Sequence, residues 1–147
     1  MSTLVAVAEI DLDQIMNFQF DPLIHRMVDK YDWTEDRSRS VFEDTKRYLF
    51  LARTTSLPLI PPPDVDEVWH NFILFTVDYA SFCERFLGKF IHHRPRRRDD
   101  PPTGNGFTVK DTLEVAKANF GELSKNWNYP GVCSKSKCSC SDWCKCS

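Results

Sequence analysis

The chain has 147 residues and a formal net charge of -2, which fits a single domain of ordinary size. A chain of this length removes about 68–70% of its unfolded surface from water, enough for a core without disulfides. The charge predicts no general attraction to nucleic acid or to a membrane, so we expect neither as a partner. The chain does not open on a basic segment followed by a long apolar one, and no apolar run approaches the roughly 20 residues of a membrane span. We therefore expect a cytoplasmic protein.

Helix signals dominate the chain, and we predict an all-α fold, a compact bundle of about four to five helices with a flexible Cys-rich C-terminal tail. In this prediction residues 1–20 are an N-terminal lead-in and residues 21–129 are the helical domain. A run of arginine, aspartate, proline and glycine at 94–106 is too polar and too rich in helix breakers for anything but a hinge loop. Residues 130–147 are the tail.

The first two helices of the domain have recognisable starts. Asp21 can cap a helix that opens on Pro22, and apolar residues follow at helical spacing. The second helix is predicted to begin at Thr34, with acidic residues in its first turn, and to run to about residue 53 or 54. A proline-rich connection over residues 57–63 then excludes helix.

Two further helical segments follow the prolines. Asp64 and Glu67, three positions apart, form a capping-box pattern at the start of the third helix. Thr76 either caps a fourth segment that reaches residue 87 or marks a kink within one longer helix. Gly88 suits the left-handed position after a helix end.

The last helix is predicted to begin at Thr108, because Asp111 follows three residues later, and to continue toward Trp127. The third helix has a different character. Its large apolar residues, among them Trp69 and Phe72, cannot all share one narrow stripe. We therefore expect the third helix to be central, covered by the second helix and the last one.

The third helix also carries the first candidate site. Asp66 and His70 lie four positions apart and share one helix face, where a carboxylate and an imidazole can hold a metal or act as a catalytic pair. A structural explanation stays open beside this one. An acidic residue is favoured in a first helical turn, and His70 can simply lie at the edge of the core.

Two adjacent histidines, His92 and His93, favour the metal hypothesis. They follow a predicted helix end on irregular backbone, where functional groups are often found. Neighbouring side chains of an extended segment point to opposite faces, so we expect only one of the two to turn toward His70. Together with Asp66, these imidazoles would suit zinc or iron(II) and leave coordination positions open. The remaining histidine, His25, lies on an amphipathic helix and is expected to be structural.

The tail is the second candidate site, because five of the six cysteines lie in its last fifteen residues. Its two Cys-X-Cys pairs allow several thiolates to surround one soft ion, so zinc or copper(I) is the expected ligand. The alternative is a tail of reactive thiols without a dedicated ligand. The sixth cysteine, Cys83, stands on an apolar face and is expected to be buried rather than nucleophilic. The tail cysteines are Cys133, Cys138, Cys140, Cys144 and Cys146.

Two other functions compete with metal binding. In one, the domain is a non-enzymatic module for a protein partner, with the aromatic residues of the third helix purely in the core. In the other, the domain is a carrier whose Ser- and Cys-rich C-terminus is the substrate of a peptide-modifying enzyme. The residue pattern indicates no substrate for an activity of the domain itself.

The segment that contains the third helix resembles the characteristic segment of the glycine-rich-domain-containing-protein-like family. The resemblance covers about residues 21–95 and implies a helical domain, but no established reaction. Many relatives carry a second histidine where this chain has Phe72, so a Trp-His-X-His metal pair is not available here. The features that carry the resemblance are a proline-led start, Asp66, Trp69-His70, Ile73-Leu74, Tyr79, Cys83, Gly88 and His92-His93 followed by Pro95.

Overall fold

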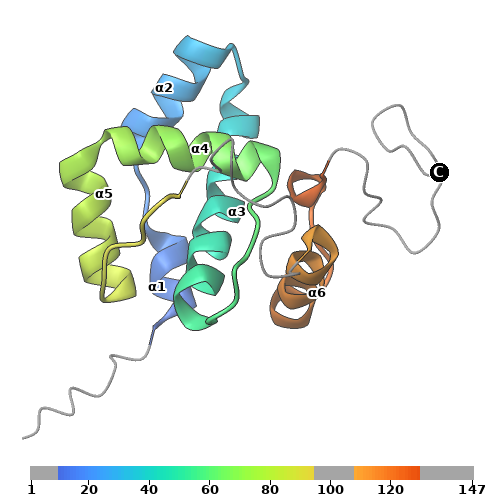
Figure 1. The fold of residues 1–147 in the computed structure, drawn as a ribbon. Helices are drawn as coiled ribbons and strands as arrows, with labels where there is room; N and C mark the ends of the chain where they lie inside the picture. Colours follow the sequence, from blue (N-terminus) through green and yellow to red (C-terminus); the bar gives the residue numbers. More distant parts are fainter. Residues whose placement is uncertain (1–9, 95–107, 130–147) are drawn as a thin grey trace, which may run out of the picture.

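The computed structural model describes residues 10–94 and 108–129, and over these ranges the fold is all-α, which confirms the predicted class (Figure 1). The described part contains six α-helices, a π-helical segment and a short 3-10 helix. None of these helices is both long enough and apolar enough to cross a bilayer. In chain order the elements are α1 (Leu12–Asn17), α2 (Asp21–Tyr31), α3 (Glu35–Thr54), α4 (Pro63–Leu74), α5 (Thr76–Phe82), the π-helix η1 (Cys83–Leu87), α6 (Val109–Phe120) and the 3-10 helix η2 (Lys125–Trp127).

Helix α1 lies in the segment for which no helix was expected. Asp11 caps it, because its carboxylate accepts hydrogen bonds from the backbone N–H groups of Asp13 and Gln14. Ile15 is fully buried and ties the helix to the core. At the other end, the ammonium of Lys46 on α3 donates to the carbonyl oxygens of Met16 and Phe18, at 2.9 and 2.7 Å. The core therefore begins about ten residues earlier than the sequence pattern indicates.

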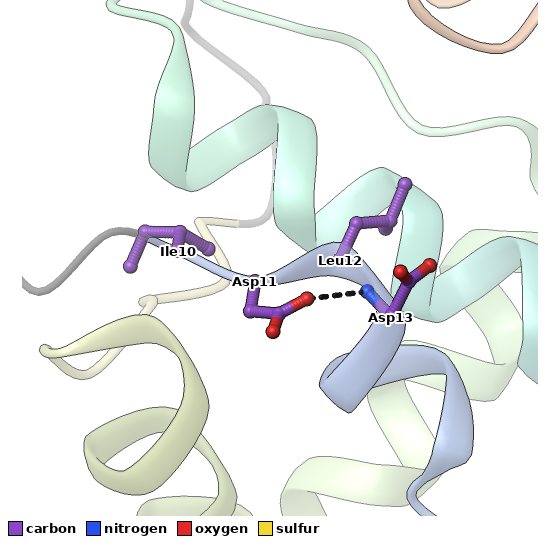
Figure 2. Close-up of a pocket in the computed structure, with 4 residues that line it drawn as sticks. All are labelled: Ile10, Asp11, Leu12 and Asp13. Atoms are coloured by element: carbon purple, nitrogen blue, oxygen red, sulfur yellow. Dashed lines mark hydrogen bonds between the residues drawn. The ribbon is translucent and has the colours of Figure 1, made fainter.

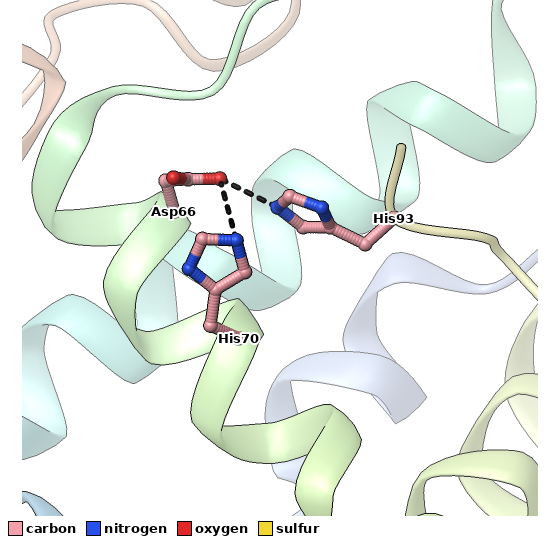
Figure 3. A group of neighbouring side chains, drawn as sticks. All are labelled: Asp66, His70 and His93. Carbon is pink, nitrogen blue, oxygen red and sulfur yellow. Dashed lines mark hydrogen bonds and ion pairs between the residues drawn. The ribbon is translucent and has the colours of Figure 1, made fainter. Parts of the chain in front are cut away.

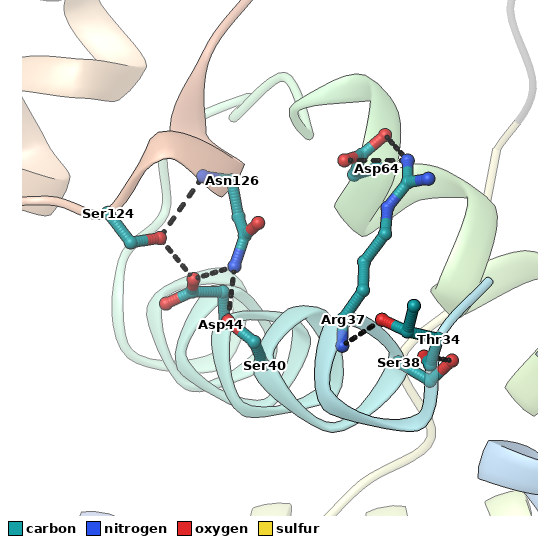
Figure 4. A network of polar contacts seen from close by, with 8 residues as sticks. All are labelled: Thr34, Arg37, Ser38, Ser40, Asp44, Asp64, Ser124 and Asn126. Carbon is teal, nitrogen blue, oxygen red and sulfur yellow. Dashed lines mark hydrogen bonds and ion pairs between the residues drawn. The ribbon is translucent and has the colours of Figure 1, made fainter.

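The cap predicted for α3 is correct, and the cap predicted for α2 is wrong. The Thr34 side chain accepts a hydrogen bond from the backbone N–H of Arg37, and α3 ends at Thr54 as expected (Figure 4). Helix α2, in contrast, has Phe20 at its cap position and makes no side-chain cap bond there. The carboxylate of Asp21 pairs instead with Arg39 of α3, at 3.1 Å. An arginine on a neighbouring helix has replaced the local backbone as the partner of this carboxylate.

The capping box expected at the start of α4 is not formed either. The helix begins at Pro63, with Pro62 at the cap position, two residues before Asp64, and there is no side-chain cap bond. The Asp64 carboxylate lies 3.3 Å from the guanidinium of Arg37, so it joins α4 to α3 (Figure 4). Both incorrect cap predictions thus have the same physical cause, an ion pair between helices.

Helix α4 is packed on several sides, as expected, although the part of the predicted last helix that covers it is chiefly η2. It lies against α2, α3, α5 and η2, and its side chains Trp69 and Phe72 are buried in the core. Phe75 interrupts the helix with ψ of 70°, so Thr76 begins the separate helix α5, which turns away from α4 in Figure 1. This break selects the five-helix alternative of the prediction over the four-helix one, and α1 is the sixth helix.

The last part of the described chain packs on the side of α3 away from α5 (Figure 1). The predicted capping box at Thr108 and Asp111 is present. Helix α6 ends at Phe120, earlier than expected, because Gly121 adopts a φ of 77°. The chain then forms η2, whose Trp127 is buried.

Candidate functional site

The candidate site begins on α4, where Asp66 and His70 lie one helical turn apart. His70 Nε2 is 3.8 Å from Asp66 Oδ1, so the two side chains point toward the same volume (Figure 3). Both are partly open to solvent, with 34% of the Asp66 side chain and 43% of the His70 side chain exposed. The four-residue spacing thus produces the shared face that the sequence predicts.

His93 reaches the same carboxylate from a different part of the chain. After η1, Gly88 adopts a φ of 78°, a left-handed conformation that favours glycine and reverses the chain direction. The following segment returns to α4, buries Ile91 and places His93 Nε2 at 2.6 Å from Asp66 Oδ1 (Figure 3). Only 10% of the His93 side chain is exposed. Of the two adjacent histidines, His93 is therefore the one that meets Asp66 and His70.

These three side chains form one cluster. Each of Asp66, His70 and His93 offers one ligand atom, and the three atoms all lie within 4.8 Å of one another. The two imidazole rings are also in contact, with centroids 4.1 Å apart. Residues on α4 and on the segment after Gly88 thus bring one carboxylate and two imidazoles to a single point.

Glu67 stands beside the cluster rather than in it. Its Oε2 atom lies 3.8 Å from His70 Nδ1, on the nitrogen that does not face Asp66. A carboxylate in this position can orient an imidazole and favour the proton on Nδ1. From the sequence, Glu67 was expected only to take part in a capping box, and its position within one turn of Asp66 and His70 was the available signal.

Aromatic side chains form the inner wall of the site. The Trp69 ring lies 4.3 Å from the His93 ring, centroid to centroid, and its indole N–H donates to the Tyr79 hydroxyl. Behind Trp69 lies Tyr48, whose ring centroid is 5.5 Å away. Burial raises the pKa of Tyr48, and the negative charge of Asp66 raises it further. Both tyrosine hydroxyls donate to backbone carbonyl oxygens, so the wall is closed by hydrogen bonds.

The other candidate residues of the described chain lie elsewhere. His92 is exposed, and its ring packs against Phe90 with a centroid distance of 4.7 Å. His25 is on the exposed face of α2. Cys83 is fully buried, as expected, and burial raises the pKa of its thiol. The five tail cysteines lie outside the described residues, so soft-metal binding by the tail stays a prediction.

Two surface cavities are found away from the cluster. The first is lined by Ile10, Asp11, Leu12 and Asp13, and Figure 2 shows that it is the capped start of α1. The Asp11 carboxylate at its edge is already engaged by the backbone of its own helix. The second is a shallow region on the outer face of α2, over residues 22–30. Neither contains a residue of the cluster, and among residues 10–94 and 108–129 potential metal-ligand atoms converge only at the cluster, which we therefore take as the candidate site.

Comparison with known proteins replaces the expected family by another. The model of the UCP032817-like family matches residues 11–116, which is most of the described chain. Nothing in this match indicates a glycine-rich-domain-containing family, so the resemblance drawn from the α4 segment was misleading. Its features Trp69, Tyr79 and Cys83 are buried core residues and Gly88 is a turn residue, so the pattern reflects packing that unrelated helical domains can share. No curated protein and no solved structure matches the chain.

Proposed function

The chain belongs to the UCP032817-like family, and we propose that its helical domain binds a metal ion through Asp66, His70 and His93. The convergence of three ligand atoms within 4.8 Å supports this proposal. The description of the family names no reaction and no ligand, so the proposal rests on the chemistry of these side chains.

One carboxylate oxygen and two imidazole nitrogens are a ligand set suited to zinc or iron(II). Zinc binds such atoms at about 2.0–2.2 Å, so the ligand atoms of a tetrahedral site stand about 3.3 Å apart. The separations of Asp66 Oδ1 from His93 Nε2 and from His70 Nε2, 2.6 and 3.8 Å, lie on either side of this value. Small side-chain rotations are therefore enough to admit the ion.

The two histidines have different parts in this proposal. His93 is held against the indole of Trp69 and is almost buried, so little side-chain freedom remains to be lost on binding. His70 is exposed, so an ion can reach the cluster from solvent. In the absence of metal, a proton lies between His93 Nε2 and Asp66 Oδ1, and metal and proton compete for this nitrogen. Three protein ligands leave at least one coordination position for water or a substrate.

A cobalt(II) titration of the full chain tests the proposal. The protein is purified without a histidine tag, freed of metal, and titrated with cobalt(II) and then with zinc in competition. Nitrogen and oxygen ligands give weak visible bands, whereas thiolates add strong near-ultraviolet charge-transfer bands. The absorption spectrum therefore distinguishes the domain site from any ion bound by the tail cysteines.

Two neighbouring histidines provide the variant and its control. His93→Ala removes a ligand and is expected to weaken cobalt binding at the nitrogen and oxygen site by at least about 100-fold. His92→Ala changes an exposed imidazole outside the cluster and should leave the affinity within about twofold. Equal affinities of the two variants, or a wild-type spectrum with thiolate bands alone, would contradict the proposal. The Asp66–His93 contact would then be a structural hydrogen bond.

A further inference from the structure

One buried side chain contacts both parts of the chain that supply the cluster. Tyr79, on α5, is fully buried. Its hydroxyl accepts a hydrogen bond from Trp69 Nε1 at 2.9 Å and donates one to the Ile91 carbonyl oxygen at 2.5 Å. Trp69 directly precedes His70 on α4, and Ile91 lies two residues before His93. The phenol therefore joins the helix that carries two site residues to the segment that carries the third.

The same two partners define where the His93 ring lies. The indole of Trp69 packs against this ring, with centroids 4.3 Å apart and an angle of 56° between the planes. The backbone at Ile91 determines how closely the segment approaches α4. Phe90, on the same segment, packs edge-on against the Tyr79 ring, with ring centroids 5.2 Å apart. The segment after Gly88 therefore contacts both the ring and the hydroxyl of Tyr79. Both surfaces that locate His93 thus depend on one hydroxyl group.

We propose that Tyr79 is a positioning residue of the cluster, whose hydroxyl sets the location of His93 relative to Asp66. Without this hydroxyl, the Trp69 N–H and the Ile91 carbonyl lose their buried partner and must find others. The segment after Gly88 then shifts, and the 2.6 Å contact of His93 with Asp66 changes with it. The positional effect is independent of metal, whereas its consequence for metal affinity rests on the proposed function.

A second buried tyrosine offers a matched control. Tyr129 is also buried, and its hydroxyl also donates to a backbone carbonyl oxygen, that of Ile60. Tyr79→Phe and Tyr129→Phe therefore delete the same group from similar surroundings. The Tyr79 hydroxyl bonds to Trp69 and to the Ile91 carbonyl oxygen, beside His93, whereas the Tyr129 hydroxyl bonds to Ile60.

The first measurement uses metal-free protein. Nitrogen-15 NMR of the imidazole side chains reports the surroundings of each histidine, and His93→Ala assigns the His93 signals. We expect Tyr79→Phe to displace the His93 signals and Tyr129→Phe to leave them in place. Unchanged His93 signals in Tyr79→Phe, or equal displacements in the two variants, would overturn the proposal.

The second measurement uses cobalt(II) affinity in a double-mutant cycle. Tyr79→Phe is expected to weaken binding about tenfold, as the loss of an outer partner of a metal ligand does. Tyr129→Phe should change it twofold or less. In the His93→Ala background, Tyr79→Phe should add no further loss, because the side chain that it positions is gone. An equal loss in both backgrounds would overturn a role through His93.

The two proposals fail in different ways. If the wild-type domain binds no cobalt through nitrogen and oxygen, the proposed function fails and the metal-free NMR signals alone decide the role of Tyr79. If Tyr79→Phe loses its helical circular dichroism, 4-aminophenylalanine at position 79 takes its place. This residue keeps a donor for the Ile91 carbonyl, so the His93 signals should stay near their wild-type positions. Displaced His93 signals in spite of this donor would overturn the proposal.

Discussion

Two aspartates on the neighbouring helices α3 and α4 show how differently a carboxylate can be used in this domain. Asp44 on α3 is 3% exposed, and its carboxylate accepts hydrogen bonds from Ser124 and Asn126 at 2.6 and 2.8 Å (Figure 4). It also accepts one from Arg47 at 2.8 Å. Asp66 on α4 is a third exposed and shares one oxygen between two imidazole nitrogens (Figure 3). The partners of Asp44 donate hydrogen bonds to it, whereas the partners of Asp66 are imidazole nitrogens, which can also bind a metal.

This difference separates a structural carboxylate from a candidate ligand. Arg47, Ser124 and Asn126 donate hydrogen bonds to Asp44, and the last two fix the start of η2 onto α3. An imidazole such as those at Asp66 can exchange a proton for a metal ion on the same nitrogen. Burial alone would have pointed to Asp44 as the special carboxylate. The chemistry of the partners points to Asp66 instead.

High pH is expected to have the largest effect, because it unfolds the domain and so disrupts the surroundings of Asp44 and Asp66 together. Burial raises the pKa of Tyr48, Tyr79 and Tyr129 above the ordinary value of 10.0. Above about pH 10 the unfolded chain loses these protons while the folded chain keeps them, so the free energy of unfolding falls as pH rises. The lowered pKa of buried Lys46 acts in the opposite direction, but it is one group against three.

The measurement for this prediction is a paired titration. Tyrosinate absorbance near 295 nm and helical circular dichroism near 222 nm are followed from about pH 8 to about pH 12, a range that brackets the ordinary tyrosine pKa of about 10. The buried tyrosines should ionise only as helical signal is lost. Ionisation of all four tyrosines with the helical signal intact would contradict this prediction.

Asp66→Asn should break the candidate site and spare the fold. The amide keeps the shape of the side chain but lacks the charge that a metal requires, so we expect metal affinity to fall by at least about 100-fold, or roughly 2.7 kcal/mol. The free energy of unfolding of the metal-free protein should change by about 1 kcal/mol or less, because the side chain is partly exposed. Cobalt titration and urea denaturation provide the two numbers. A large loss of stability with unchanged metal affinity would show that Asp66, like Asp44, is a structural carboxylate and not a metal ligand.

Asp44→Ala should give the reverse pattern. The buried amide of Asn126 and the hydroxyl of Ser124 lose their acceptor, so we expect the free energy of unfolding to fall by about 2 kcal/mol. Arg47 is partly exposed and can turn to water, so no buried charge is stranded. Urea denaturation measures the loss, and cobalt affinity should stay within about twofold of wild type. A tenfold weaker affinity would show that the two regions are coupled.

Gly88→Ala is expected to have the smallest effect and tests how strongly the turn holds His93 in place. A side chain at a φ of 78° costs about 1 kcal/mol, although the added methyl group would meet only the end of the Arg53 side chain at 3.8 Å. Thermal unfolding should show this loss of stability. The His93 imidazole signals should stay close to wild type, because Tyr79 still holds the segment. If Gly88→Ala displaces the His93 signals further than Tyr79→Phe does, the Gly88 turn, and not Tyr79, determines the position of His93.

Local patterns predicted the parts of this structure that depend on local contacts. Thr34 and Thr108 cap their helices as expected, and Asp66 and His70 share a face because helical spacing requires it. Asp21 and Asp64 carry the same local signal as a cap but pair with arginines of α3, which no spacing within one helix reveals. Long-range packing decided between these two uses of a carboxylate.

The choice between His92 and His93 shows the same limit at the site. Their alternation predicts that one of the two faces α4, but which one depends on the length of η1 and the conformation of Gly88. Tyr79 carried a usable signal, since a buried phenol needs a hydrogen-bond partner. Its partners, Trp69 and the Ile91 carbonyl, come ten and twelve residues away along the chain and were not predictable from spacing.

Because Lys46 is covered by α1, detachment of this helix can be detected by chemical labelling of the lysine. The Lys46 side chain is 0% exposed, and its ammonium is engaged by two carbonyl oxygens at the end of α1 and by Glu43 at 2.8 Å. An amine-directed reagent can therefore reach Lys46 only when α1 has left its place on α3. Mass spectrometry of the labelled chain would follow this opening at a single atom, with the exposed Lys30 as an internal standard for reagent activity. The rate at which Lys46 reacts would measure how often the N-terminal helix detaches while the rest of the domain stays folded.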